Sequence, residues 1–207
     1  MRVVGAILVG GQATRMGGVA KPLLRVAGRT ILERQLAVLE PLVEEILLVA
    51  SADQEELYRG KGGRVVLDHR ADAGAGMGPL AGLETALLAT DADAVLLVGG
   101  DMPALHHGAL ELVLGARTSA EAAVPRVGGY CEPLHARYAR RVLPRVSALL
   151  DGGTRALMAL LDELDVEYVE EERLAAADPS GLTFSNVNTP EELARLELCL
   201  RSPDDGL

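Results

Sequence analysis

The sequence predicts a doubly wound α/β fold, with a mostly parallel sheet covered by helices on both faces. Short apolar runs without strict alternation recur along the first half of the chain, each flanked by Gly, Asp or Ser. Such runs are typical of strands that are buried on both faces of a parallel sheet. Segments with helical spacing lie between them, and this alternation of strand and helix is the pattern of an α/β protein.

Four buried strands are expected in the first half. The first apolar run ends in Gly-Gly-Gln and leads straight into a charged loop, which favours a strand over a secretory signal peptide. The apolar runs are too short to span a bilayer, which needs about 18 residues. The runs that predict strands are Val3 to Val9, Ile46 to Ala50, Val65 to Leu67 and Ala94 to Val98.

Three helices are expected among these strands. Thr30 and Glu33 have the spacing of a capping box, so a helix that begins after Thr30 is expected to cover the sheet. The segments Leu80 to Thr90 and His107 to Arg117 are expected to form the other two helices. His106 and His107 are interpreted as the start of a helix rather than as metal ligands, because no Cys or acidic partner stands at zinc spacing.

The pattern loosens after about residue 120. Two strands, Ala122 to Val127 and Tyr130 to His135, are expected to form a hairpin around Gly128-Gly129 that lies over the sheet edge. The remaining expected elements are helices at Ala136 to Leu150 and Arg155 to Leu164, a strand at Val166 to Val169, and a final helix at Pro190 to Leu200 capped by Thr189. The polar tail, residues 201–207, is expected to fray.

One domain is expected, spanning residues 1–200, because 207 residues with 49% hydrophobic composition suffice for a single core. The formal net charge of −10 and the aromatic content of 2% argue against a nucleic-acid partner. Cys131 and Cys199 fit neither a metal cluster nor a disulfide framework. We expect no membrane partner and a cytoplasmic location.

A glycine-rich segment, Gly10 to Lys21, follows the first expected strand. Glycines let backbone N–H groups approach an anion, and α/β folds place ligands at the carboxyl ends of strands. Arg15 offers a planar fork for phosphate oxygens, while Lys21 offers a compact charge. The segment matches neither the P-loop nor the dinucleotide-binding pattern, so on its own a simple turn with solvated charges explains it nearly as well.

Asp101 is the candidate metal ligand. It follows the strand Ala94 to Val98 through Gly99-Gly100, so its carboxylate is expected at the same sheet edge as the glycine-rich segment. Mg²⁺ usually takes one or two carboxylates together with phosphate oxygens and water. An Asp that only shapes a turn is the alternative, and the two preceding glycines favour the metal ligand.

Several motifs resemble known enzymes. Gly-Gly-x-x-x-Arg-Met-Gly followed by Lys-x-Leu-Leu resembles the signature of the nucleotidyltransferases that include sugar-nucleotide pyrophosphorylases and molybdenum cofactor nucleotidyltransferases. The family that the remaining motifs resemble is molybdenum cofactor guanylyltransferase; these motifs are Gly78-Pro79-Leu80-Ala81-Gly82, Gly99-Gly100-Asp101-Met102-Pro103 and Asn186-Val187-Asn188-Thr189-Pro190. The chain departs from the family at Val9, where Ala is usual, and at Ala20, where Asp is usual.

The resemblance implies a Rossmann-like nucleotidyltransferase fold and Mg²⁺-dependent transfer of GMP from GTP to the phosphate of molybdopterin, with release of pyrophosphate. It implies that the N-terminal half binds the nucleotide and the C-terminal half the acceptor. The catalytic residues would be Arg15, Lys21 and Asp101. The residues implied to bind the nucleotide are Leu8, Val9, Gly10, Gly11, Arg15, Lys21, Ser51, Asp68, Gly78, Pro79, Leu80 and Asp101.

The remaining candidate residues have two readings each. Asn186 and Asn188 would point to one face of an extended segment and are implied to bind the acceptor, although Asn-x-Asn-Thr-Pro also suits the start of a helix. Asp68 is implied to contact the nucleotide, and a turn explains it nearly as well. Ser51 stands where the family commonly has Asn, and its hydroxyl replaces only part of an amide's hydrogen bonding. Glu132 and His135 either line the acceptor pocket or lie on the ordinary surface.

Other functions remain open at this stage. A cytidylyltransferase or a sugar-1-phosphate nucleotidyltransferase shares the glycine-rich segment, although Gly10-Gly11 favours guanine. A GTP-binding adaptor that lost catalysis would also keep that segment. The resemblance further allows a transient contact with other proteins of cofactor biosynthesis.

Overall fold

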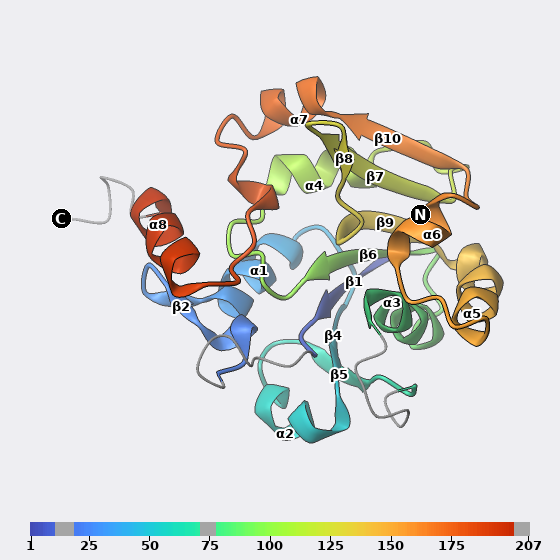
Figure 1. Cartoon of the computed structure of the whole chain (residues 1–207), viewed down its shortest axis with the longest axis horizontal. Helices are drawn as coiled ribbons and strands as arrows, with labels where there is room; N and C mark the ends of the chain where they lie inside the picture. The colour runs from blue at the N-terminus through green and yellow to red at the C-terminus, as the bar shows by residue number, and fades with distance from the viewer. Residues whose placement is uncertain (11–18, 71–77, 201–207) are drawn as a thin grey trace.

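An eight-stranded sheet runs through the centre of the molecule (Figure 1). The computed structural model describes residues 1–10, 19–70 and 78–200, so the expected tail lies outside the described residues. The strand order is β10-β7-β9-β6-β1-β4-β5, with β8 paired to β7. The strands are β1 (Val3–Leu8), β4 (Ile46–Ala50), β5 (Arg64–Leu67), β6 (Ala94–Gly99), β7 (Ala122–Val127), β8 (Tyr130–Cys131), β9 (His135–Ala139) and β10 (Val166–Glu170).

The sheet is mostly parallel. Strands β5, β4, β1 and β6 pair in parallel, and Ile7 of β1 stands opposite Leu48 on one side and Val98 on the other. Strand β9 is antiparallel to both β6 and β7, and β10 is parallel to β7. The carboxyl ends of β1, β4, β5 and β6 therefore meet at one edge of the sheet.

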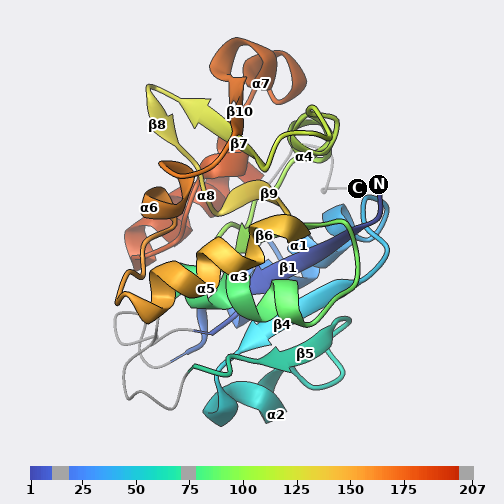
Figure 2. The same ribbon diagram turned by 90° about the vertical axis from the view of Figure 1, so that its right-hand side faces the viewer.

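Helices cover both faces, which confirms the predicted fold class (Figure 2). Side chains of β1 alternate between the two cores, with Val3 and Ile7 in one and Val4 and Ala6 in the other. The first core is covered by α1 (Ile31–Leu39), α2 (Glu55–Tyr58), α4 (His107–Leu114) and α7 (Glu171–Ala177). The second is covered by α3 (Gly78–Leu88), α5 (Leu143–Asp151) and α6 (Leu157–Leu161).

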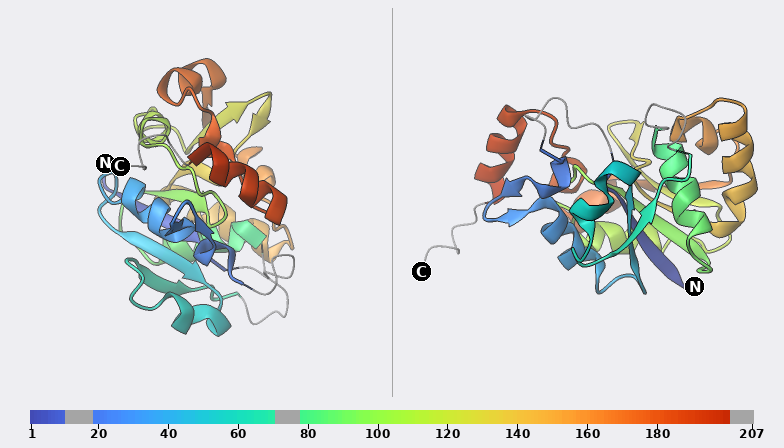
Figure 3. Two further views of the ribbon diagram at one scale, coloured as in Figure 1. Left: turned by 90° about the vertical axis from the view of Figure 1, so that its left-hand side faces the viewer. Right: turned by 90° about the horizontal axis from the view of Figure 1, so that it is seen from below.

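A third, smaller core joins a hairpin near the start of the chain to the last described helix. The hairpin of β2 (Arg25–Val26) and β3 (Arg29–Thr30) packs against the last helix, α8 (Pro190–Leu200). Figure 3 shows both at one end of the molecule, with α8 beside the hairpin. Val26, Ile31, Val187 and Leu196 form this core.

Local sequence signals set the ends of two helices. The Thr30 hydroxyl accepts from Glu33 N–H at 3.1 Å, and the Glu33 carboxylate accepts from Thr30 N–H, which is the predicted capping box. At the start of α8 the same reciprocal pair joins Thr189 and Glu192. Both helices begin where the sequence predicts. His107 also begins α4, as expected.

The expectation for the segment from Ala136 was wrong, because a strand stands where a helix was expected. His135 and Arg137 face one core while Ala136 and Tyr138 face the other, and all four are fully buried. Pairing with β6 and β7 thus overrides the helical preference of Ala and Arg. The helix begins later, at Leu143, after the 3₁₀ turn η4 (Arg140–Val142). Strands β7 and β8 pair as the expected hairpin, although β8 ends at Cys131 rather than His135, and β7 lies within the main sheet rather than over its edge.

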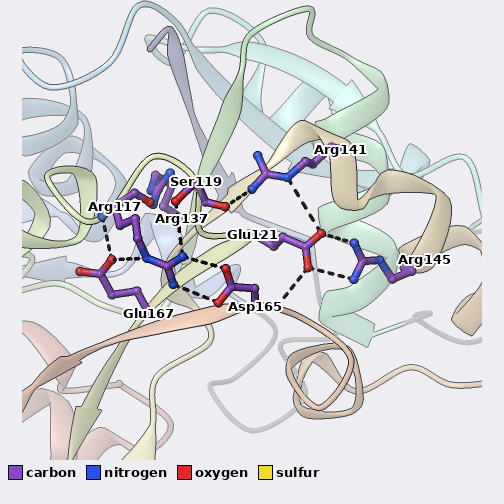
Figure 4. Close-up of polar contacts among 8 residues, drawn as sticks. All are labelled: Arg117, Ser119, Glu121, Arg137, Arg141, Arg145, Asp165 and Glu167. Atoms are coloured by element: carbon purple, nitrogen blue, oxygen red, sulfur yellow. Dashed lines mark hydrogen bonds and ion pairs between the residues drawn. The ribbon is translucent and has the colours of Figure 1, made fainter.

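An ionic network closes the end of the sheet where β7 and β10 begin (Figure 4). Arg117 Nη1 lies 2.9 Å from the Asp165 carboxylate, and Arg145 pairs with Glu121. Arg137 is fully buried, and its Nη2 donates to the Arg117 carbonyl at 3.0 Å. These contacts fix the end of the sheet opposite the carboxyl ends of the parallel strands.

A buried carboxylate joins α3 to α5 and to the segment after β5. Glu84 has a side-chain exposure of 2% and accepts from Arg70 Nη2 at 2.8 Å and from Ser147 Oγ at 2.5 Å. Burial disfavours the charged carboxylate, but the hydrogen bonds from Arg70 and Ser147 outweigh it and lower the pKa of Glu84 below its usual 4.5. The ion pair holds Asp68 and its neighbours against α3.

No described helix is both long and apolar enough to cross a lipid bilayer.

Glu84→Gln is expected to lower the free energy of unfolding at pH 7 by about 2 kcal/mol, because it removes the buried charge that pairs with Arg70 and leaves this guanidinium only the exposed Asp151 as a charged partner. The folded pKa of Glu84 lies below 4.5, so its contribution is complete above that pH and is lost as the pH falls. Urea unfolding at pH 7 and pH 3 measures both effects. Glu111→Gln, on the exposed face of α4, is the control. Equal stability of Glu84→Gln and wild type at pH 7 would contradict the prediction.

Candidate active site

Polar and glycine residues gather where the parallel strands end. Gly10 follows β1, Ser51 follows β4, Asp68 follows β5 and Asp101 follows β6. Because these strands are parallel, all four positions lie at one edge of the sheet, as predicted. Gly11 and Arg15 lie outside the described residues.

Gly100 lets two chain segments touch at this edge. Its N–H donates to the Leu8 carbonyl at 3.1 Å, which joins the ends of β6 and β1. A Cβ at this position would lie 2.5 Å from the Leu8 oxygen and 2.9 Å from Pro22 Cγ, so a larger residue would push these segments apart. The packing at this point therefore requires a glycine at position 100. The close approach of the two strand ends also fixes the backbone position of the following residue, Asp101.

Lys21 links the two halves of the chain. It opens the 3₁₀ turn η1 (Lys21–Leu23), and its Nζ lies 3.2 Å from Asp101 Oδ2 and 2.6 Å from Asn188 Oδ1. The side chains of Lys21 and Asp101 are 25% and 27% exposed, so this ion pair is shielded yet open to a ligand. Three residues that the sequence placed in one site thus meet in space.

The segment before α8 forms the helix start that the sequence offered as one reading of its asparagines. Val187 N–H donates to the Asp101 carbonyl at 2.9 Å, and the Val187 side chain is fully buried. The flanking Asn186 is exposed, and Asn188 reaches Lys21. The Glu192 carboxylate accepts from Asn188 N–H at 2.7 Å, so the same residues also start the helix. Binding of an acceptor by this pair remains a prediction.

Asp68 and Ser51 occupy the far side of the edge. Asp68 Oδ1 accepts from Arg70 N–H at 3.0 Å, which is the turn that the sequence offered as the alternative. Ser51 precedes the 3₁₀ turn η2 (Ala52–Gln54), and its side chain does not cap that turn. The buried Tyr58 hydroxyl donates to the Val9 carbonyl at 3.1 Å, and burial raises the pKa of Tyr58 to about 12. Contacts of Asp68 and Ser51 with a nucleotide remain predictions.

An apolar cavity opens beside the start of α3. Its volume is about 410 Å³ and its walls are almost wholly apolar. One wall is tied to the site, because Gly99 N–H donates to the Leu134 carbonyl at 3.0 Å, two residues before Asp101. Of the residues that line this cavity, only Gly78 and Pro79 were site candidates from the sequence, and there as nucleotide-binding residues. Its lining residues are Gly78, Pro79, Pro133, Leu134, Arg155, Ala156, Leu157 and Met158.

His135 is buried, which rules out the surface placement that the sequence also allowed. Its Nε2 lies 2.9 Å from Thr183 Oγ1, and its ring stands 4.9 Å from that of Phe184. Both partners belong to the 3₁₀ turn η5 (Leu182–Phe184), which leads into the asparagine segment. His135 therefore joins the sheet to the chain that carries Asn188. Glu132 is half-buried, and burial raises the pKa of its carboxyl.

The oxygen donors suit a metal that arrives with phosphate. Within residues 1–10, 19–70 and 78–200, no three His, Cys, Asp or Glu side chains cluster as metal ligands. Asp101 supplies one carboxylate, and Asn188 Oδ1 approaches the same ammonium group from another side. Mg²⁺ commonly keeps several waters and takes one or two carboxylates plus substrate phosphates. The residues present fit that mode of binding.

His135→Gln is expected to reduce the loss of stability in mild acid. Burial lowers the pKa of His135 to about 4 from 6.5, so the unfolded chain takes up a proton in this range and the folded chain does not. Stability from neutral His135 is complete above pH 6.5 and falls by about 3 kcal/mol toward pH 4. Urea unfolding across that range tests this, with exposed His107→Gln as control. An unchanged pH profile in His135→Gln would refute it.

The comparisons with known proteins agree on one family. The model of the MobA-like NTP transferase domain matches residues 5–168. A probable molybdenum cofactor guanylyltransferase from Thermococcus kodakarensis is 36% identical, and the match covers 94% of each chain. A molybdenum cofactor guanylyltransferase from Vibrio parahaemolyticus is 32% identical, over 91% of this chain and 92% of the relative.

A solved structure shares the fold. The molybdopterin-guanine dinucleotide biosynthesis protein A from Archaeoglobus fulgidus superposes with a TM-score of 0.80 at 27% identity, covering 95% of this chain and 97% of the other. The resemblance inferred from the sequence motifs is confirmed by these matches. The chain belongs to the MobA-like NTP transferase family, and it is a nucleotidyltransferase.

Proposed function

We propose that the protein transfers GMP from GTP to the terminal phosphate of molybdopterin, giving a molybdopterin guanine dinucleotide and pyrophosphate. The contact of Lys21 with Asp101 and Asn188 carries the proposal. It joins the last residue of the glycine-rich segment to the carboxylate that follows β6 and to the asparagine that precedes α8. The names of the two sequence relatives support the same acceptor and the same nucleotide.

The proposed reaction is an in-line displacement. A phosphate oxygen of the acceptor attacks the α-phosphorus of GTP while the bond between the α-phosphorus and the bridging oxygen breaks. Pyrophosphate leaves with the electron pair of that bond. The protein supplies position and charge rather than a nucleophile, because the acceptor brings the attacking oxygen.

Each residue has a distinct task in this scheme. Lys21 places its ammonium group where charge develops on the α-phosphate. Asp101 would hold Mg²⁺, which neutralises triphosphate charge when bound. Gly11 and Arg15, which lie outside the described residues, would bind the remaining phosphates. The N–H of Gly10 already donates to the Val49 carbonyl at 3.0 Å, so Gly10 would serve by bringing the backbone close to the ligand.

The apolar cavity is the proposed place for the pterin of the acceptor. Its walls suit a flat ring system with few charges, and Leu134 connects it to the strand that ends near Asp101. The cavity also begins at Gly78-Pro79, where the positive end of α3 favours an anion.

The wild-type protein is expected to form a pterin dinucleotide from MgGTP and molybdopterin, and to do so more slowly with MgATP, MgCTP or MgUTP. Chromatography of the dinucleotide and a pyrophosphate assay measure the reaction. Lys21→Ala and Asp101→Asn are expected to lower kcat by at least about a hundredfold, because each removes charge stabilisation from the transition state. No dinucleotide with any of the four nucleotides would overturn the proposal, and preference for CTP would make the protein a cytidylyltransferase.

Met158→Glu is expected to raise the KM for molybdopterin about tenfold while leaving the KM for GTP unchanged. Met158 lines the cavity and is 46% exposed, so the substitution is tolerated by the fold but brings a charge beside the pterin. Leu88→Glu is the matched control, because Leu88 is 54% exposed at the far end of α3. Steady-state kinetics with each substrate varied in turn separates the two constants. A rise in the KM for GTP instead would place the nucleotide in the cavity.

A further inference from the structure

The ammonium group of Lys21 stands against Asp101, the carboxylate proposed to hold the metal. Lys21 Nζ lies 3.2 Å from Asp101 Oδ2, and both side chains are about three-quarters buried. A divalent cation bound to Asp101 would approach the same oxygen. Two positive charges cannot share one carboxylate at such a distance without a strong mutual repulsion.

A lysine at this position is unusual for this chain. Of its 20 basic residues, 18 are arginines, and Lys61 is the other lysine. Lysine carries a compact, strongly hydrated point charge, whereas arginine carries a planar fork that pairs with a carboxylate through two bonds. A compact ammonium group resembles a small cation in the space and ligands it requires. The Lys21 ammonium group can therefore occupy the place of a metal ion beside Asp101 and move away when the metal binds.

We propose that Lys21 is an internal counter-ion that competes with the divalent cation for Asp101, so that the metal enters the site together with the nucleotide. The inference rests on the proposed nucleotidyl transfer and concerns the order of events in that same site. A triphosphate ends the competition. Its oxygens bind the metal, and they also accept hydrogen bonds from the Lys21 ammonium group, which can then leave Asp101.

The contact of Lys21 with Asn188 links the binding of metal and nucleotide to the binding of the acceptor. Asn188 Oδ1 accepts from Lys21 at 2.6 Å, and the backbone of this residue is already held by Glu192. When Lys21 turns toward phosphate, the Asn188 side chain loses that donor and becomes available to a second substrate. The geometry therefore orders binding, with the metal and nucleotide before the acceptor.

Binding of Mn²⁺ to the protein without nucleotide tests the competition directly. The loss of the free Mn²⁺ signal in electron paramagnetic resonance gives the Kd for each variant. Lys21→Met is expected to bind Mn²⁺ about tenfold more tightly than wild type, because the competing charge is gone. Lys21→Gln keeps a polar side chain of similar length without the charge, and it is expected to behave in the same way.

Three controls define the site. Lys61→Met removes the exposed second lysine and is expected to match wild type. Lys21→Arg keeps a cation beside Asp101 and is expected to bind Mn²⁺ as weakly as wild type. Lys21→Met combined with Asp101→Asn is expected to lose the gained affinity. Circular dichroism and thermal unfolding show that each variant is folded.

The result separates this inference from the proposed reaction. If folded Lys21→Met and Lys21→Gln bind Mn²⁺ no more tightly than wild type, the competition is refuted, whatever the wild-type turnover with MgGTP. A gain that persists in the double variant would also refute it, because the metal would then not bind Asp101. If wild type makes no dinucleotide but the gain is observed, the reaction fails while the competition stands.

Discussion

The central strands are buried on both faces, and this constraint decides where chemistry can occur. Along β1, β4 and β6 nearly every side chain is apolar and packed against a helix, so the interior has no place for a substrate. Polar side chains can emerge only where the strands end. Parallel pairing then brings several of those ends to one edge. Asp101 and the backbone around Gly10 and Gly100 meet there for this reason.

Features that local sequence controls could be predicted. The capping pairs at Thr30 and Thr189 fix the first turn of α1 and of α8, because a side chain and a backbone amide three residues apart satisfy each other. The buried strand Ile46–Ala50 is recognised by its continuous apolar run. The position of Asp101 could be predicted because the carboxyl ends of parallel strands lie at the same edge of a sheet.

Features that depend on distant partners could not be predicted. Strand β9 reads as the start of a helix until β6 and β7 supply neighbours that bury both of its faces. The ion pair of Arg70 with Glu84 and the apolar cavity each join segments far apart in sequence. Hydrophobic periodicity does not reveal contacts between segments that are so far apart in sequence. The family motifs implied separate roles for Lys21 and Asn188, and only the fold shows that the two side chains are in contact.

The small core between the hairpin of β2 and β3 and helix α8 makes the site depend on a segment that follows Lys21 by more than half of the sequence. Lys21 and Asn188 are separated by 167 residues, yet Val187 packs against Val26 and Ile31. A nascent chain that has released only the first four parallel strands already contains the glycine-rich loop and Asp101. It still lacks the segment that engages Lys21. During synthesis the site is therefore completed only after α8 has emerged and packed against the hairpin.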